Sequence, residues 1–434
     1  MRKVLVSLLL VSFCGNATAQ SQKPVQQPTP DLRLTIQDAE QLAIKNNPSL
    51  SASRLRTLAQ GQVTREVRSA LLPQATVNLT AVEPKEASRI TAGGLNNPIL
   101  YERAAAGVSV QQLLTDFGRT RNLVASARFR QDAQRSTDLA TQAEIVFAVD
   151  QAFYRALQSV ALLHVAESTV QARQDVADQI GALTKAKLKS DLDLSFANVN
   201  LAQAQLLLLD ASNTKDEAFA NLNALLGFEN QQTYTLVDET AQPPGPPQDA
   251  AALVKLAFQS RPDLSAVEEE WQAAERFRRA EHDLQRPTLS TMAVVGDTPI
   301  RADQLSPWYG AVGVNLSIPI FNGFQFSARA READYRADAQ RKMIQDLRNR
   351  ISRDVQVSYL AAQSSYSRIA VTQQLLSQAN MALDLAQTRY KLGLGSIVEV
   401  SQAQLQQTEA AIGNTNARYG YEAALSSLRF QTGR

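Results

Sequence analysis

One stretch of the chain changes its hydrophobic period midway, and this change limits the folds open to it. From residue 309 to 320, apolar residues alternate with small or polar ones, as in a β-strand with one apolar face. After the Asn322-Gly323 break the sequence becomes rich in Ala, Arg and Gln, so the strand feeds directly into a helix. Residues 106–135 show the same change, with the break at 116–118. A unit of strand, turn and helix is therefore used twice.

This reuse indicates an internal repeat. Residues 43–52 (AIKNNPSLSA) align with residues 257–266 (AFQSRPDLSA), and Pro73 and Pro287 follow at the same spacing. The alignment predicts a first repeat from 32 to 227, a linker from 228 to 249 that ends in a proline-rich run, and a second repeat from 250 to 434.

Long segments without proline predict two helical hairpins. No proline occurs from Arg119 to Leu183, and a continuous helix of that length would extend about 100 Å, which a globular domain does not need. The second repeat has an equivalent segment at 324–390. The remaining expected elements are turns at 185–191 and 391–396, return helices at 194–226 and 397–431, shorter helices at 35–71 and 250–284, strands at 74–81, 105–114, 287–295 and 309–320, and loops at 83–102 and 296–307.

The first residues have the pattern of an export signal. Residues 1–19 contain a charged start, a short apolar run and the sequence Ala17-Thr18-Ala19, which is typical of a cleavage site. Residues 20–31 are rich in Pro and Gln and predict an extended lead-in. The only cysteine, Cys14, lies inside the signal, and the bulky Phe13 before it argues against processing as a lipoprotein.

The charge balance gives no support for a nucleic-acid partner. The 434 residues include 44 Lys and Arg against 42 Asp and Glu, a formal net charge of +2, whereas binding to phosphate backbones needs a basic excess. His164 and His282 are far apart and lack the spacing of metal ligands. The sequence has no phosphate-binding glycine loop and no nucleophile elbow. It therefore predicts neither an enzyme nor a bound cofactor.

A membrane location would have to rely on the strands. No segment after the signal has the length and apolarity of a membrane helix, which needs about 20 residues. Open sheet edges leave backbone groups unsatisfied in lipid, so spanning strands must close into a barrel, and small barrels need about eight. The chain offers four expected strands, which implies oligomerisation.

At this point the sequence resembles the TolC-like outer membrane efflux proteins, in the right order and nearly throughout the mature chain. The motifs that carry the resemblance are the helix starts NPSL (47–50) and RPDL (261–264), the junctions FG (117–118) and FNG (321–323), and the C-terminal runs RYKLG (389–393) and IVEVSQAQ (397–404).

The resemblance implies an α+β membrane protein made of two structural repeats, each with two β-strands and a long antiparallel α-helical hairpin. Three copies would form a homotrimer with one twelve-stranded β-barrel in outer membrane lipid and an α-helical barrel across the periplasm. Such a channel is passive. It would dock to a periplasmic adaptor and, through it, to an inner-membrane pump for efflux or type I secretion. The alternative is a soluble periplasmic coiled-coil scaffold or adaptor.

The resemblance also assigns roles at the hairpin turns, which it places at the closed periplasmic end. Glu399 matches the first of two lumen-ring aspartates, Gln402 falls where the second is expected, and Asp193 corresponds to Glu399 in the first repeat. Tyr390 matches a tyrosine that links helices there, while Gly395 replaces an arginine partner found in some members. A solvated acid near a helix N-terminus remains an alternative for Glu399.

Two further sets of residues are candidates for contacts. Lysines and glycines at the turns could dock the adaptor, or the lysines could merely keep an exposed tip soluble: Lys185, Lys187, Lys189, Lys391, Gly393 and Gly395. Aromatic residues near strand ends suit the membrane interface, unless the strands form a soluble sandwich with Trp308 in its core: Tyr101, Trp308, Tyr309 and Phe321. We expect Val312, Val314, Leu316, Ile318 and Ile320 to meet lipid, and Asn315 and Ser317 to line water.

Overall fold

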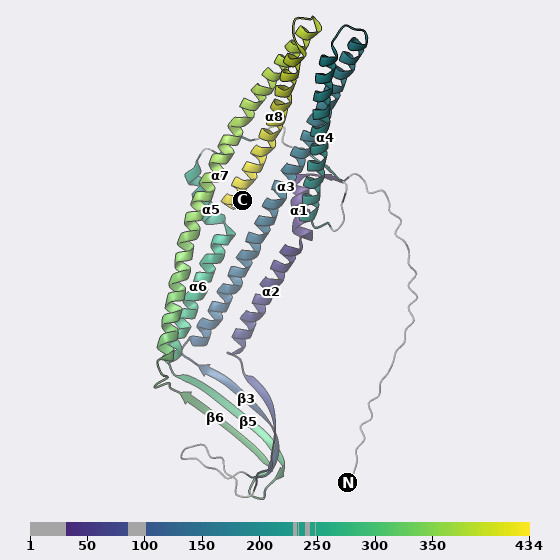
Figure 1. Cartoon of the computed structure of the whole chain (residues 1–434). Helices are drawn as coiled ribbons and strands as arrows, with labels where there is room; N and C mark the ends of the chain where they lie inside the picture. Colours follow the sequence, from purple (N-terminus) through teal and green to yellow (C-terminus); the bar gives the residue numbers. More distant parts are fainter. Residues whose placement is uncertain (1–31, 86–100, 229–231, 233, 239–243, 248) are drawn as a thin grey trace, which may run out of the picture.

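The structure is a computed structural model that describes residues 32–85, 101–228, 232, 234–238, 244–247 and 249–434 (Figure 1). The expected signal peptide with its Cys14, the lead-in at 20–31 and residues 86–100 of the first loop lie outside the described residues. The described molecule is elongated, with a β-sheet at one end and the turns of two helical hairpins at the other.

A four-stranded antiparallel sheet joins the two halves of the chain. Its strands are β2 (Gln74–Val82), β3 (Arg103–Thr115), β5 (Thr288–Arg301) and β6 (Trp308–Ser317), in the order β2-β3-β5-β6. The central pair, β3 and β5, brings together one strand from each repeat, with Val108 opposite Val295. Among the described strands, β2 and β6 each have one partner, so both edges of the sheet are open.

The strand register gives the sheet one apolar and one polar face. Paired residues of antiparallel strands point to the same side. One face therefore carries Ala75, Val77, Leu79, Ala106, Val108, Val110, Ala293, Val295, Val312, Val314 and Leu316. The other is mainly polar and carries Thr76, Asn78, Ser109, Gln111, Ser290, Asn315 and Ser317, together with Met292 and Val294, while Thr291 and Asp297 are polar exceptions on the first face. Val312 is 83% exposed and Leu79 is 79% exposed, so the apolar face is uncovered in the single chain.

Each repeat continues from the sheet into a long hairpin. Helices α3 (Arg119–Lys185) and α7 (Gln325–Lys391) have 67 residues each, or about 100 Å. They return as α4 (Asp191–Leu225) and α8 (Ile397–Thr432). Buried alanines recur every seven residues on α4 at 197, 204, 211 and 218, because small side chains at a heptad spacing allow close coiled packing. None of the described helices combines the length and apolar character needed to cross a lipid bilayer.

A proline breaks the helix that precedes the strands in each repeat. The first repeat has α1 (Ile36–Asn46) and α2 (Pro48–Ser69), and the second has α5 (Ala250–Ser260) and α6 (Pro262–His282), followed by the short η1 (Asp283–Gln285). Asn47 and Arg261, the residues before the prolines, are both extended. Proline disfavours helical geometry in the preceding residue but is well placed at the first helical position, so each helix restarts at once.

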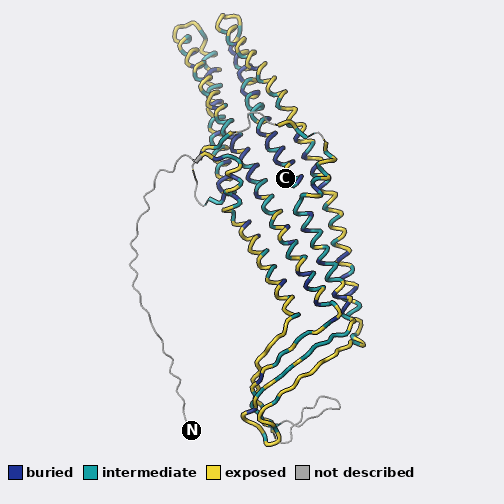
Figure 2. The backbone as a smooth tube through the Cα atoms, turned by 180° about the vertical axis from the view of Figure 1, so that it is seen from behind, coloured by how far each residue is buried: buried dark blue, intermediate teal, exposed yellow. Residues whose placement is uncertain are grey.

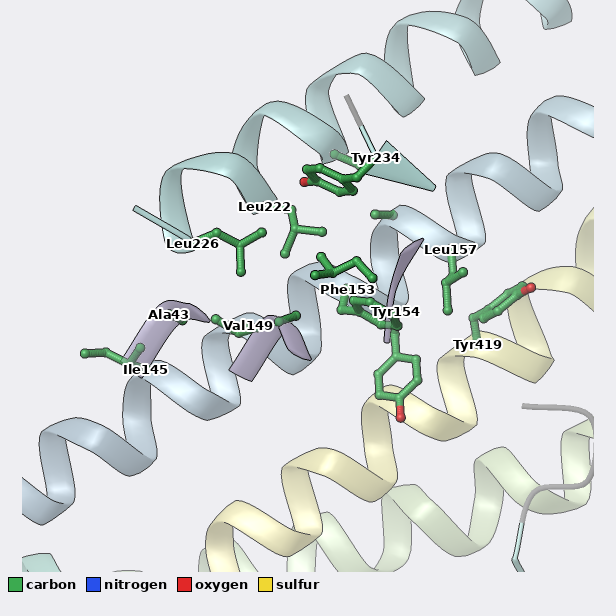
Figure 3. Packing of buried hydrophobic residues seen from close by; sticks show 14 of the residues in the cluster. Ala43, Ile145, Val149, Phe153, Tyr154, Leu157, Leu222, Leu226, Tyr234 and Tyr419 are labelled. Atoms are coloured by element: carbon green, nitrogen blue, oxygen red, sulfur yellow. The ribbon is translucent and has the colours of Figure 1, made fainter. Parts of the chain in front are cut away.

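The main apolar core lies in the middle of the molecule, where α1, α3, α4 and α8 meet (Figure 3). Phe153, Val149 and Leu222 are buried there, together with Tyr419 from the second repeat. Strands β1 (Leu32–Leu34) and β4 (Tyr234–Leu236) pair in parallel and place Leu34 and Tyr234 in the same cluster. Buried positions become sparse toward the sheet and the hairpin turns (Figure 2).

Three expected boundaries differ from the structure. The expected linker contains β4, whose pairing with β1 joins segments far apart in sequence. Strand β5 continues beyond the expected residue 295 to Arg301, because β3 supplies pairing partners as far as Arg103. Strand β6 ends at Ser317, so Ile318 and Ile320 lie beyond it, next to Pro319, which has no N–H for a ladder.

Candidate gate and docking site at the hairpin turns

The two hairpins close with turns of the same backbone geometry. In the first turn the Leu188 N–H donates to the Leu183 carbonyl at 2.8 Å, and in the second the Leu394 N–H donates to the Arg389 carbonyl at 2.8 Å. The equivalent positions between them, Lys187 and Gly393, have φ values of +61° and +76°. Glycine adopts this conformation at little cost, whereas lysine is strained in it. The first turn therefore keeps a lysine at a position better suited to glycine.

The residues after the turns, Asp193 and Glu399, differ in how their carboxylates are used. The Asp193 N–H donates to Ser190 Oγ at 3.1 Å, and its Oδ2 accepts from the Ser190 N–H at 3.3 Å, a reciprocal capping box. The Glu399 N–H donates to Ser396 Oγ at 3.2 Å. The Glu399 carboxylate instead pairs with Arg389, whose Nε lies 3.3 Å from its Oε1.

Gly395 provides the space for this ion pair. A Cβ at Gly395 would lie 3.1 Å from the second Glu399 carboxylate oxygen and 3.2 Å from Arg389 Cβ. Position 395, where some family members have an arginine, is a glycine in this chain. The guanidinium that pairs with Glu399 comes instead from Arg389 on α7, the other helix of the same hairpin. Both side chains are about half exposed, so the pair is accessible to solvent.

Tyr390 lies between the two hairpins. It packs against the cluster that contains Ile180 and Ala197 of the first hairpin and Ile397 of the second. The Lys189 Nζ lies 3.9 Å from the centre of the Tyr390 ring, a cation–π contact from one turn to the other hairpin. Burial, and next the charge of Asp193, raise the pKa of the Tyr390 hydroxyl, which has no hydrogen-bond partner among the described residues.

Gln402 is one turn further along α8 and belongs to a different environment. It lines a hollow of about 370 Å³ between α3, α4 and α8. Its neighbour Ser401 accepts a hydrogen bond at 2.7 Å from Asn200 Nδ2 of α4, which also joins the hairpins. The structure thus brings Tyr390, Lys189 and Asp193 together. It pairs Glu399 with Arg389, and it places Gln402 elsewhere, at the hollow between α3, α4 and α8.

The outer surface of the turns combines lysines with exposed apolar side chains. Lys185, Lys187 and Lys391 are exposed, and Lys189 is half-buried under its contact with Tyr390. Five apolar residues at the turns are between 55% and 70% exposed: Leu188, Leu192, Leu392, Leu394 and Val398. This apolar surface was not predicted from the sequence. The signal for it is the leucine that recurs at the equivalent position of both turns, Leu188 and Leu394.

The four aromatic candidates occupy different surroundings. Trp308 lies on the apolar face of the sheet and is 65% exposed, and Phe321 beyond β6 is 76% exposed. Tyr101 is half-buried just before β3. Tyr309 differs, because it belongs to the face of Asn315, opposite the expected lipid face. Its ring covers Gly107 and Gly296, whose missing side chains leave it room.

The two histidines pair with carboxylates on exposed helix surfaces. His164 Nδ1 lies 3.2 Å from Glu167 Oε2, and His282 Nε2 lies 2.9 Å from Asp334 Oδ1. Over the described ranges, no group of three or more His, Cys, Asp or Glu side chains is arranged to hold a metal ion.

Comparison with known proteins identifies relatives along the whole described chain. Outer membrane protein TolC of Escherichia coli (strain K12) is 24% identical over 439 residues, with 97% of this chain and 84% of TolC covered. Alkaline protease secretion protein AprF of Pseudomonas aeruginosa is 25% identical over 418 residues, with coverage of 92% and 84%. A crystal structure of CusC matches with a TM-score of 0.80 and 18% identity, over 96% of this chain and 99% of that one.

The family comparison covers both repeats. The family described as outer membrane efflux protein matches residues 39–228 and 253–434. The matched segments contain both hairpins and all four strands of the large sheet. The chain therefore belongs to the outer membrane efflux protein family and is an outer membrane channel of a tripartite efflux or secretion system.

Proposed function

We propose that three copies of the chain close into one passive channel that is gated at the hairpin turns. The open edges of the sheet carry this proposal. Strands β2 and β6 each leave one side unpaired among the described strands, and an unpaired edge is unstable in lipid. Pairing β2 of one copy with β6 of the next repeats the same contact around a ring, and three copies supply twelve strands.

The two faces of the sheet support the orientation of this barrel. The apolar face that contains Val77 and Val312 meets lipid, and the polar face that contains Asn315 and Ser317 lines the water-filled interior. Tyr309 then belongs to the interior, where it fills the space above Gly107 and Gly296. Trp308 and Phe321, at opposite ends of β6, remain candidates for the lipid interface, and Tyr101 precedes β3 near the end where Trp308 lies.

The gate in this proposal is the set of contacts around Tyr390. Closed hairpins are held by Lys189 on the ring and by the buried apolar cluster, while Arg389 neutralises Glu399. Opening would separate α7 and α8 from the first hairpin by breaking the contact of Lys189 with Tyr390, while Arg389 and Glu399 move together within the second hairpin. Glu399 would then contribute one carboxylate per copy to a lumen ring. Such a ring favours cations. Gln402 and Asp193 would contribute polar groups to the same passage.

The partners follow from the outer surface of the turns. An adaptor hairpin would contact the exposed leucines and the lysines Lys185, Lys187 and Lys391, and the strained or flexible positions Lys187, Gly393 and Gly395 shape the turns.

We infer that the repeats extend over 32–227 and 250–434, joined by 228–249. The channel performs no reaction in this proposal, and an inner-membrane pump reached through the adaptor supplies the energy.

Native mass spectrometry of the detergent-extracted protein tests the number of copies. We expect a trimer. A variant with two cysteines, Thr76→Cys on β2 and Asn315→Cys on β6, should be cross-linked between copies by a short bifunctional reagent. Thr76→Cys with Ser109→Cys, on neighbouring strands of one copy, is the matched intramolecular control. A monomer, or cross-links between copies that never exceed two chains, would contradict the closed ring.

A further inference from the structure

Arg173 on α3 is a buried cation that lacks a charged partner. It is only 9% exposed and lies between α3 and α8, some distance from the turns. Its one hydrogen bond in the structure joins Nη2 to Thr408 Oγ1 at 3.4 Å, which is long. Burial is the only cause that shifts its pKa, which falls to about 10, and no described carboxylate opposes this shift. Arg173 is therefore fully charged at neutral pH and poorly compensated.

The charge of Arg173 is only partly compensated by the chain. A buried charge is unfavourable unless an opposite charge or a full set of hydrogen bonds compensates it. Arginine cannot escape this cost by releasing its proton near pH 7. The guanidinium offers five N–H donors in a planar fork, and a single long bond to Thr408 uses one of them. None of the remaining donors is sealed from solvent among the described residues, so they are open to water or to a ligand.

Arg173 lines two hollows. One, of about 350 Å³, is formed by α3, α7 and α8, and the other, of about 370 Å³, by α3, α4 and α8. Both are lined by Arg173 and Thr408, and neither lining includes an Asp or Glu side chain. Their other polar groups are neutral amides and hydroxyls, such as Gln402, Gln404 and Gln407 of α8, and the imidazole of His164.

We propose that Arg173 binds a small oxyanion, of the carboxylate, sulfate or phosphate class, between the two hairpins of one copy. Two oxygens of such an ion match the guanidinium fork, and the side-chain amides of Gln402 and Gln407 on α8 supply further donors. The residues that line the two hollows belong to α3, α4, α7 and α8. A bound ion joins α3 to α8 and so strengthens the contact between the hairpins.

Sulfate binding to the purified full-length channel in detergent tests this site. Calorimetric titration at constant ionic strength should give saturable binding of one sulfate per chain. Arg173→Gln should weaken this binding at least tenfold, and Arg173→Lys, which keeps the charge but loses the fork, should weaken it to a smaller extent. Arg155→Gln is the control, because Arg155 lies on the same helix but is exposed, and sulfate should bind this variant as it binds the unmodified chain.

Soaking selenate into crystals of the unmodified protein locates the bound oxyanion, and this experiment does not depend on whether a variant folds. The anomalous signal of selenium should appear within hydrogen-bond distance of the Arg173 guanidinium. An anomalous peak at Arg173 without saturable sulfate binding in solution would mean an adventitious ion only and would overturn the proposal. Equal sulfate affinity in Arg173→Gln and in the unmodified chain would overturn the proposal as well. The absence of saturable binding by the unmodified chain would also overturn it, and would indicate that a group from another copy fills the hollow.

Discussion

The middle of the molecule and the hairpin turns use the same long helices but hold them together in different ways. In the middle, Phe153 and Tyr421 are 2% and 0% exposed, and apolar side chains from both repeats interlock. At the turns, Leu188 and Leu394 are 70% and 69% exposed, and the contacts are a cation on a ring and a half-exposed ion pair. Close packing resists deformation, whereas exposed polar contacts exchange readily with water. The difference indicates a rigid middle and turns that can move.

The largest expected effect comes from removing a side chain from the middle. Phe153→Ala leaves a cavity in the core of Figure 3 and should destabilise the protein by about 3–5 kcal/mol, the usual range for buried Phe. The midpoint of thermal unfolding in detergent measures this loss. Leu188→Ala, at an exposed turn position, should change stability by no more than about 0.5 kcal/mol. Equal losses in the two variants would remove the distinction between the regions.

A pair of carboxyl groups makes the stability of the middle depend on pH. Burial, and then the nearby Asp150, raise the pKa of Glu40 from 4.5 to about 7, and burial also raises the pKa of Asp150. Asp150 accepts a hydrogen bond from Ser426 Oγ at 2.8 Å, and Arg429 opposes the shift in both acids. A protonated Glu40 can donate to the Asp150 carboxylate.

The sign of this effect follows from the raised pKa. Between pH 4.5 and about 7 the folded protein holds a proton that the unfolded chain releases, so stability decreases as the pH rises through this window. We expect Glu40→Gln, which keeps a donor without titrating, to flatten the dependence and to gain about 1 kcal/mol at pH 8, after allowance for solvent screening. Thermal unfolding from pH 5 to 8 checks this. A parallel pH dependence in both proteins would contradict the assignment.

A smaller effect is expected from the cation–π contact between the hairpins. Lys189→Met removes the charge above the Tyr390 ring, a contact worth about 0.5–1 kcal/mol. Hydrogen exchange of the turn amides should become faster by up to about fivefold, with little change in the middle. Lys185→Met, at an exposed lysine of the same turn, is the control and should leave the exchange rates unchanged. Faster exchange in both variants would assign the effect to the general charge of the turn.

The smallest effect is expected at the strained position of the first turn. Lys187→Gly relieves a φ of +61° but increases the freedom of the unfolded chain, and the net gain should be about 0.5 kcal/mol. It should appear as slower hydrogen exchange of the first turn, whereas Lys391→Gly, at a helical position, should not slow exchange in the second. Unchanged or faster exchange in Lys187→Gly would argue against strain at this position.

Local signals in the sequence predicted most of the fold. The change from alternating to helical spacing located the strands and the hairpins, whereas the shorter helices expected at 35–71 and 250–284 are each divided before a proline, at Pro48 and Pro262. The pairing of β1 with β4 was not predicted, because three-residue strands carry too little pattern and their pairing depends on segments distant in sequence. The end of β5 was missed for the same reason, since its partner β3 determines its length.

The candidate site was only partly predictable. Glu399 and Tyr390 were singled out through a resemblance, but the sequence did not indicate that Arg389 pairs with Glu399, because helix hairpin geometry brings them together across the turn. The placement of Lys189 above Tyr390 depends on the packing of one hairpin against the other. The alternation of residues 309–320 already placed Tyr309 on the side of Asn315, but the two glycines beneath its ring became evident only from the strand register.

Single-channel conductance in planar lipid bilayers tests most directly the claim that the turns form the gate. The unmodified protein should show small, cation-selective conductance. Lys189→Met removes a contact between the hairpins worth about 0.5–1 kcal/mol, so the open state should become up to about fivefold more populated, and Glu399→Gln should reduce cation selectivity. Conductance and selectivity that are unchanged in both variants would contradict a gate at the turns, and a water-soluble, non-conducting protein would contradict the channel itself.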